Sequence, residues 1–182
     1  DYASTSALAP NSGTINDAAG NAATLTLASP GATNSLGANK ALVIDGTAPT
    51  ITSVTSTTGD GTKKVGDAIA VTVNFSEAVT LAGGNLVVTL ETGSTDRTIT
   101  LSSISGATSV SGAYTVQSGD TSIDLTVGSI ALDGGSLSDA AGNAMSSFSI
   151  GTNLSASKAL VIDTTLPTIT SVTSSTADGI YK

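Results

Sequence analysis

The sequence contains no cysteine and no histidine. The chain therefore has no disulfide, no thiol nucleophile and no imidazole base, and it lacks the side chains that dominate zinc sites. A serine–histidine or cysteine–histidine catalytic pair is excluded for the same reason. We therefore predict that the chain is not an enzyme.

Basic and aromatic residues are also scarce. Six residues are Lys or Arg against fourteen Asp or Glu, so the formal net charge is −8. An acidic chain without a basic patch does not favour nucleic-acid binding. With no Trp, two Phe and three Tyr, the core must be filled by branched aliphatic side chains. No apolar run approaches the roughly 18 residues that a membrane span requires, so no span is predicted.

The residues that are abundant indicate an all-β fold. Thr, Ser, Val and Ile are plentiful, whereas most strong helix formers are rare. Twelve of the fourteen acidic residues are Asp and only two are Glu. Asp suits turns and oxygen-ligand sites better than it suits solvated helix faces.

The chain contains a long internal repeat. DAAGNA stands at 17–22 and again at 139–144, KALVID at 40–45 and 158–163, and PTITSVTS at 49–56 and 167–174. The offset is 122 residues for the first block and 118 for the other two. Such a period matches an independent domain of roughly 100–150 residues rather than a solenoid repeat.

The repeat predicts three parts of a tandem array. Residues 1–46 are the C-terminal part of one module, 47–164 a complete module, and 165–182 the first strand of the next. Because both ends fall inside a module, we expect a longer parent protein.

Within the complete module, alternating apolar residues predict short strands. Residues 68–75 are the clearest case, since every second side chain is apolar. A Gly/Ser-rich stretch after Leu101 and the segment 133–143 are expected to be loops. Frequent turn signals between the strands favour a β-sandwich. The predicted strands cover 50–55, 68–75, 86–90, 99–101, 114–116, 123–127, 147–150 and 159–162.

A tandem array enters each module at one end and leaves at the other, so the number of full strand passes should be odd. We expect seven, with 147–150 not a full pass. Glu77 and the loop 139–143 then lie at the end where the chain arrives. The turns at 59–61 and 119–120 are expected at the opposite end, beside Asp163.

Three carboxylates are therefore expected to converge near the start of the complete module. Asp45 ends one module, and Pro49 stiffens the short linker to the next. Glu77 and Asp139 should lie beside this linker, and Asn143 can add an amide oxygen. Grouped carboxylates require a compensating cation, and calcium takes six to eight oxygen ligands. Magnesium fits less well, because it prefers a near-ideal octahedral shell.

Each Asp taken alone is more typical of a turn than of a metal site. Taken together, however, the linker acid Asp45, the strand acid Glu77 and the loop acid Asp139 support a metal site about as well as they support plain turns. Asp163 repeats Asp45 and is predicted to be a ligand at the following junction. Weaker ligand candidates are Asp17, Asn21, Asp60 and Asp120, and for the last two a plain turn is the preferred interpretation.

The segment VGDAIAVTVNFSEAV at 65–79, the DAAGN loop and the linker VIDGTAP at 43–49 resemble bacterial immunoglobulin-like tandem repeats. These repeats form the stalks of large secreted adhesins, including repeats-in-toxin adhesins and giant cell-surface proteins. The linker is also similar to the calcium-binding junctions of cadherins, although it has one Asp where those have several acids. By that resemblance, Asp45 and Asp163 are linker ligands and Glu77 faces them.

The resemblance implies immunoglobulin-like β-sandwich modules in tandem, outside the cell or on its surface. The leading hypothesis is a structural spacer in an adhesin or biofilm protein, stiffened by calcium at the junctions. Its partners are neighbouring repeats of the same chain. One alternative is a self-assembling extracellular filament or sheath, with contacts to other copies. A second is a glycan- or protein-binding module, which the scarcity of aromatic residues disfavours.

Overall fold

The computed structural model describes all residues from 1 to 182. It divides into two compact units, Asp1–Asp45 and Gly46–Lys182. The division falls one residue before the first boundary expected from the repeat, and residues 165–182 are not separated from the second unit. Neither of the two short helices is long and apolar enough to cross a membrane.

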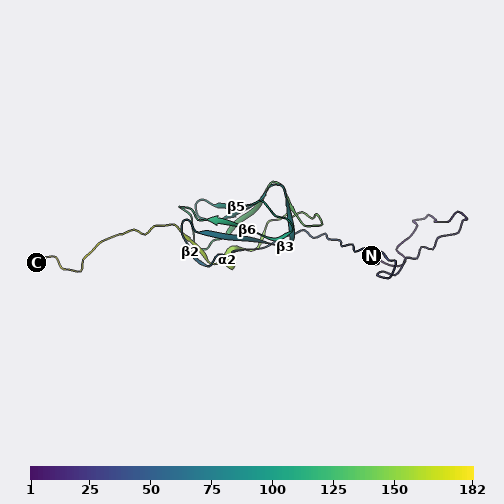
Figure 1. The fold of residues 1–182 in the computed structure, drawn as a ribbon, viewed down its shortest axis with the longest axis horizontal. Helices are drawn as coiled ribbons and strands as arrows, with labels where there is room; N and C mark the ends of the chain where they lie inside the picture. The colour runs from purple at the N-terminus through teal and green to yellow at the C-terminus, as the bar shows by residue number, and fades with distance from the viewer. The chain divides into compact units, whose positions relative to one another are not determined.

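The fold is all-β, because strands dominate and the only helices are single turns. All eleven strands lie in the second unit, and the first contains one helical turn (Figure 1). The elements in chain order are α1 (Leu36–Asn39), β1 (Ile51–Thr55), β2 (Gly61–Lys63), β3 (Ala68–Ala82), β4 (Asn85–Leu90), β5 (Arg97–Leu101), β6 (Ala107–Thr115), β7 (Thr121–Ser122), β8 (Val127–Asp133), β9 (Ser136–Ser138), β10 (Ile150–Thr152), α2 (Leu154–Ser157) and β11 (Leu160–Asp163).

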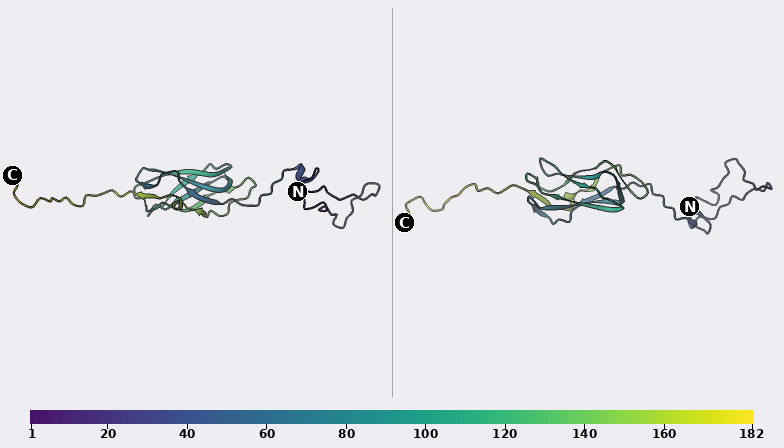
Figure 2. Two further views of the ribbon diagram at one scale, coloured as in Figure 1. Left: turned by 90° about the horizontal axis from the view of Figure 1, so that it is seen from below. Right: turned by 45° about the horizontal axis from the view of Figure 1, so that its top comes forward.

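The strands of the second unit form several sheets, which the two views of Figure 2 show closely packed. One sheet has the order β10-β1-β3-β6, with β9 paired to the far half of β3. The other two have the orders β2-β11-β7 and β5-β4-β8. β1 and β2 are consecutive but belong to different sheets, so the first segment of this unit contributes to both.

These sheets enclose one aliphatic core, as the scarcity of aromatic residues predicted. The predicted inward face of β3 is confirmed, since Ile69, Val71, Val73 and Phe75 are all buried. The alternating apolar residues of β4 and β5 are buried as well. Fully buried large side chains include Ile69, Leu86, Leu90, Leu125, Leu137, Leu154, Leu160 and Ile162.

The strand predicted at 68–75 is too short, because β3 continues to Ala82. Its pairing register with β6 shifts between Asn74 and Val79, which marks an irregularity in the middle of the strand. The first half of β3 pairs with β1 and β6, and the second half pairs with β9. The alternation itself continues, since Val79 and Leu81 keep the register of Phe75, and only the charged Glu77 interrupts the apolar pattern.

Three other predictions, one of a strand and two of loops, were wrong at least in part. The Gly/Ser-rich stretch after Leu101 contains most of β6, a nine-residue strand held by seven consecutive pairs with β3. Only Val127 of the strand predicted at 123–127 lies in a strand, β8; residues 123–126 connect β7 to β8, and Ile123 is 93% exposed. The segment 133–143 also contains β9 and is not entirely a loop. Tertiary pairing overrides composition in each case.

The predicted position of the turn at 59–61 was also wrong. β2 runs parallel to β11, with Gly61 opposite Leu160. The Asp60 side chain consequently accepts a 3.3 Å hydrogen bond from the Ala159 N–H at the start of β11, not beside Asp163. The turn at 119–120 does lie at the end of β11, because the Gly119 N–H donates to the hydroxyl of Thr164.

The two identical KALVID blocks are buried to different extents in the two units. Leu160 and Ile162 of β11 are buried between β2 and β7, whereas their counterparts Leu42 and Ile44 in the first KALVID block are 69% and 97% exposed. Residues 1–45 include no counterparts of β2 and β7 to cover that block. The local turns persist nevertheless, since α1 and α2 end with the same backbone hydrogen bond, from Lys40 to Leu36 and from Lys158 to Leu154.

Candidate metal-binding site

Three of the predicted ligands form one acidic group. One carboxylate oxygen from each of Asp45, Glu77 and Asp139 lies within 4.8 Å of the others. They come from the segment immediately before Gly46, from β3 and from the loop after β9. Glu77 and Asp139 are 62 positions apart in the sequence, and the pairing of β3 with β9 brings their segments together.

Glu77 stands at the irregularity in β3. It lies between Asn74 and Val79, where the pairing with β6 shifts register. The neighbouring Ser76 is tied to the start of the unit, because its N–H donates to the Thr50 carbonyl and its hydroxyl accepts from the Thr50 N–H. Glu77 keeps the register of Phe75 and Val79 on the buried side of β3, and its own side chain is half-buried.

Asp139 is held in a tight loop by Asn143. The Asn143 backbone N–H donates to Oδ1 of Asp139 and its side-chain amide donates to Oδ2, both at 2.8 Å. Gly142 completes the loop with φ of 93°, a conformation that favours glycine. The Asn143 side chain, followed by N–H groups of the loop, lowers the pKa of Asp139 despite the opposing effect of burial.

Asn143 thus positions Asp139 through its amide nitrogen. Its amide oxygen as a cation ligand stays a prediction. A carboxylate oxygen can accept two hydrogen bonds, so Oδ2 of Asp139, which accepts one from the Asn143 side chain, can also contact a cation. An ionised, fixed Asp139 is a suitable oxygen ligand for calcium.

The first unit repeats this loop. The Asn21 backbone and side-chain N–H groups donate to the two oxygens of Asp17, again at 2.8 Å each. The Asn21 side chain is the leading cause that lowers the pKa of Asp17. Six residues therefore suffice to encode the loop, even where the flanking apolar Ile15 is half exposed. Asp17 joins no group of three acidic side chains.

The remaining ligand candidates do not enter the acidic group. Asp163 ends β11 and accepts a 2.9 Å hydrogen bond from the Thr165 N–H. The sequence holds no counterpart of Glu77 or Asp139 after it, so its role as a ligand stays a prediction. Asp60 lies 4.0 Å from the Lys158 ammonium.

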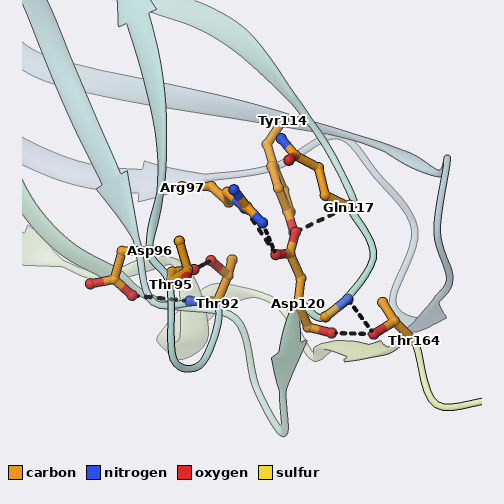
Figure 3. A network of polar contacts seen from close by, with 9 residues as sticks. Thr92, Thr95, Asp96, Arg97, Tyr114, Gln117, Asp120 and Thr164 are labelled. Atoms are coloured by element: carbon orange, nitrogen blue, oxygen red, sulfur yellow. Dashed lines mark hydrogen bonds and ion pairs between the residues drawn. The ribbon is translucent and has the colours of Figure 1, made fainter.

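Asp120 belongs to a buried polar network instead (Figure 3). Its carboxylate is 1% exposed and forms an ion pair with Arg97, whose Nε and Nη2 both lie 2.9 Å from Oδ1. The Tyr114 hydroxyl donates to Oδ2 at 2.6 Å, and the Gln117 N–H donates to the same oxygen at 2.8 Å. The preferred turn interpretation therefore fits Asp120 better than a metal ligand.

The network shifts two ionisation equilibria. Burial alone would raise the pKa of Asp120, but hydrogen bonds from Arg97, Tyr114 and Gln117 outweigh it and keep the pKa below its ordinary value. Burial, reinforced by the bond to Asp120, raises the pKa of Tyr114. The carboxylate stays charged and the phenol stays neutral, which is the state that the hydrogen bonds require.

The same network fixes the segment that follows β11. The Thr164 hydroxyl donates to the Asp120 carbonyl at 2.8 Å and accepts from the Gly119 N–H at 3.2 Å. The first repeat has Gly46 at the corresponding position, so this bond has no counterpart there. The sequence analysis did not predict this network. The one available signal was Arg97, the only arginine in the sequence, because arginine is the preferred cation in buried ion pairs.

No family model, curated protein or solved structure matches this chain. The function of this chain is therefore inferred from the repeat, the fold and the acidic group.

Proposed function

We propose that the chain is a structural spacer, made of immunoglobulin-like β-sandwich modules in tandem, that extends an extracellular or cell-surface protein. The observation that carries the proposal is the group of Asp45, Glu77 and Asp139 at the start of the second unit. A calcium ion bound there would link the residue before Gly46 to two segments of the following module.

The repeat supports the modular part of this proposal. An array of tandem domains has three features that are found here. The repeat has the period of a domain, the sheets surround one aliphatic core, and a short linker contains Pro49. A two-layer sandwich accounts for strands whose side chains alternate between buried and exposed. The scarcity of exposed aromatic residues supports a spacer over a glycan-binding module.

The mechanism is electrostatic and mechanical. Without a cation, three carboxylates within 4.8 Å repel one another and favour conformations that separate Asp45 from the other two. Bound calcium reverses the sign of this interaction and favours one linker geometry. A chain of such junctions would be stiff in calcium and flexible without it.

Small-angle X-ray scattering of the full 182-residue chain tests this function. We expect calcium to narrow the distribution of particle dimensions and chelator to broaden it. Glu77→Gln should keep the chelated profile even in calcium, because it removes one charged ligand. Glu91→Gln is the matched control, since Glu91 is exposed and outside the acidic group, and it should respond to calcium as the unmodified chain does.

Identical scattering with and without calcium in the unmodified chain would refute the stiffening mechanism. A response that Glu77→Gln retains would show that calcium acts at another place.

A further inference from the structure

β6 is an open sheet edge of unusual length. It pairs with β3 on one side and with no strand on the other. With nine residues, β6 is longer than every other strand that ends a sheet order: β10, β2, β7, β5 and β8. The start of β8 is also capped, because the Asn153 side chain donates to the Val127 carbonyl and accepts from the Val127 N–H.

The hydrogen bonds of β3 show which backbone groups of β6 face outward. The Ala70 N–H and the Asn74 carbonyl both bond toward the β1 side, to hydroxyls of Thr58 and Thr52. Residues 70, 72 and 74 therefore direct their backbone groups away from β6. Their partners in the register are Ala113, Ser111 and Ser109.

In an antiparallel ladder, a pair that does not exchange hydrogen bonds turns both sets of backbone groups outward. The N–H and C=O groups of Ser109, Ser111 and Ala113 consequently point to the open edge. All three residues are exposed. The 2.7 Å contact between the Thr72 and Ser111 hydroxyls agrees with the closer spacing of such pairs.

This edge lacks the features that normally prevent strand pairing. Proteins protect edges with charged residues, prolines or short strands, and β6 has no charge, no proline and nine residues. The charges in the other strands lie at strand ends or at the irregularity of β3: Lys63, Glu77, Arg97, Asp133 and Asp163. The net charge of −8 is thus kept off the β6 edge.

We propose that β6 pairs with β6 of a second copy of this chain, in an antiparallel arrangement centred on Ser111. This register places Ser111 opposite its own counterpart and Ser109 opposite Ala113. All three outward-facing residues then occupy hydrogen-bonded positions, as an antiparallel ladder requires. The facing side chains are small and uncharged, so a two-fold symmetric contact forms without repulsion.

The pairing joins two β10-β1-β3-β6 sheets into one continuous sheet. Its backbone hydrogen bonds supply the affinity, as in other cases of strand addition. A single edge buries less surface than a standard interface of about 1,600 Å². We therefore expect a reversible dimer at high concentration. The contact does not involve Asp45, Glu77 or Asp139, and it does not depend on the proposed spacer function or on calcium.

Sedimentation equilibrium of the full chain in chelator, from about 10 μM to about 500 μM, tests the pairing. The unmodified chain should shift from monomer toward dimer over this range. Ser111→Lys places two ammonium groups opposite each other at the two-fold axis, and like charges directly opposite oppose pairing. We expect it to weaken the dimer at least tenfold.

Ser146→Lys is the matched control, because it makes the same charge change at an exposed loop position outside β6. It should dimerise as the unmodified chain does. A chain that stays monomeric throughout, or a dimer that Ser111→Lys leaves intact, would overturn the proposal.

A thiol at position 111 gives a second test that does not depend on the stability of the lysine variant. The chain has no cysteine, so Ser111→Cys introduces a single thiol. Hydrogen-bonded antiparallel pairs have Cα atoms about 5.5 Å apart, within the range for a disulfide. Under mild oxidation, Ser111→Cys should cross-link at least tenfold faster than Ser146→Cys. Equal rates would contradict the register.

Discussion

Replacing Arg97 with Met is expected to lower the free energy of unfolding by about 3 kcal/mol. The substitution leaves the Asp120 carboxylate, which is 1% exposed, without its only charged partner. Removing one member of a buried ion pair typically costs about 3–5 kcal/mol. The lower end applies, because Arg97 is 26% exposed and the bonds from Tyr114 and Gln117 remain.

Urea denaturation measures this loss, and Lys64→Met provides the control. Lys64 also forms a 2.9 Å ion pair, with Asp67, but its side chain is 79% exposed. Exposed ion pairs contribute little, so this variant should unfold close to the unmodified chain. Similar losses in the two variants would show that burial does not govern the Arg97 interaction.

Replacing Gly135 with Ala is expected to destabilise the second unit by about 3 kcal/mol. Gly83 and Gly84 connect β3 to β4, and Gly134 and Gly135 connect β8 to β9, all with positive φ. A Cβ at Gly135 would overlap the Gly83 carbonyl and lie 2.5 Å from the Ala82 carbonyl oxygen. Both contacts are backbone atoms, so the two turns must separate to admit a methyl group.

Gly106→Ala separates this steric effect from backbone strain. Gly106 also has a positive φ, of 56°, but a Cβ there meets nothing within 4 Å. We expect this control to cost about 1 kcal/mol, the lower end of the penalty for an L-residue with a side chain in the left-handed conformation. Thermal or urea unfolding of both variants measures the difference. Equal losses would mean that the turns are not in the close contact described.

The sequence was sufficient to predict the all-β class and much of the core. Alternation identified the buried faces of β3 and β4, because a strand with one buried face repeats every two residues. The convergence of Glu77 and Asp139 on Asp45 followed from counting strand passes, although the 59–61 turn was misplaced. The position of Glu77 was predictable because it depends only on the direction of β1 and β3.

What the sequence did not predict depends on partners distant in the chain. β6 is rich in Gly, Ser and Ala, and it is a strand because β3 lies beside it. The ion pair of Arg97 and Asp120 joins residues on either side of β6, so no local pattern marks it. The irregularity at Glu77 was hidden for a similar reason, since a register shift is a property of two strands and not of one.

The two kinds of repeated block behave differently in the two units: the loop keeps its structure in both copies, and the strand forms in only one. The loop at 17–22 keeps the hydrogen bonds of the loop at 139–144, because those bonds lie within the loop itself. The block that contains Val43 and Ile44 forms no strand, although its copy is β11. Turns are therefore local properties of this chain, and strands are properties of the whole module.

Calcium titration of the full chain by isothermal calorimetry tests the central claim most directly. We expect one site, with a dissociation constant in the range of about 10⁻⁴–10⁻³ M that is common in extracellular modules. Glu77→Gln should weaken binding at least tenfold, and Glu91→Gln should leave it unchanged. No binding at about 10 mM calcium, or equal affinity in the unmodified chain and Glu77→Gln, would contradict a cation held by Asp45, Glu77 and Asp139.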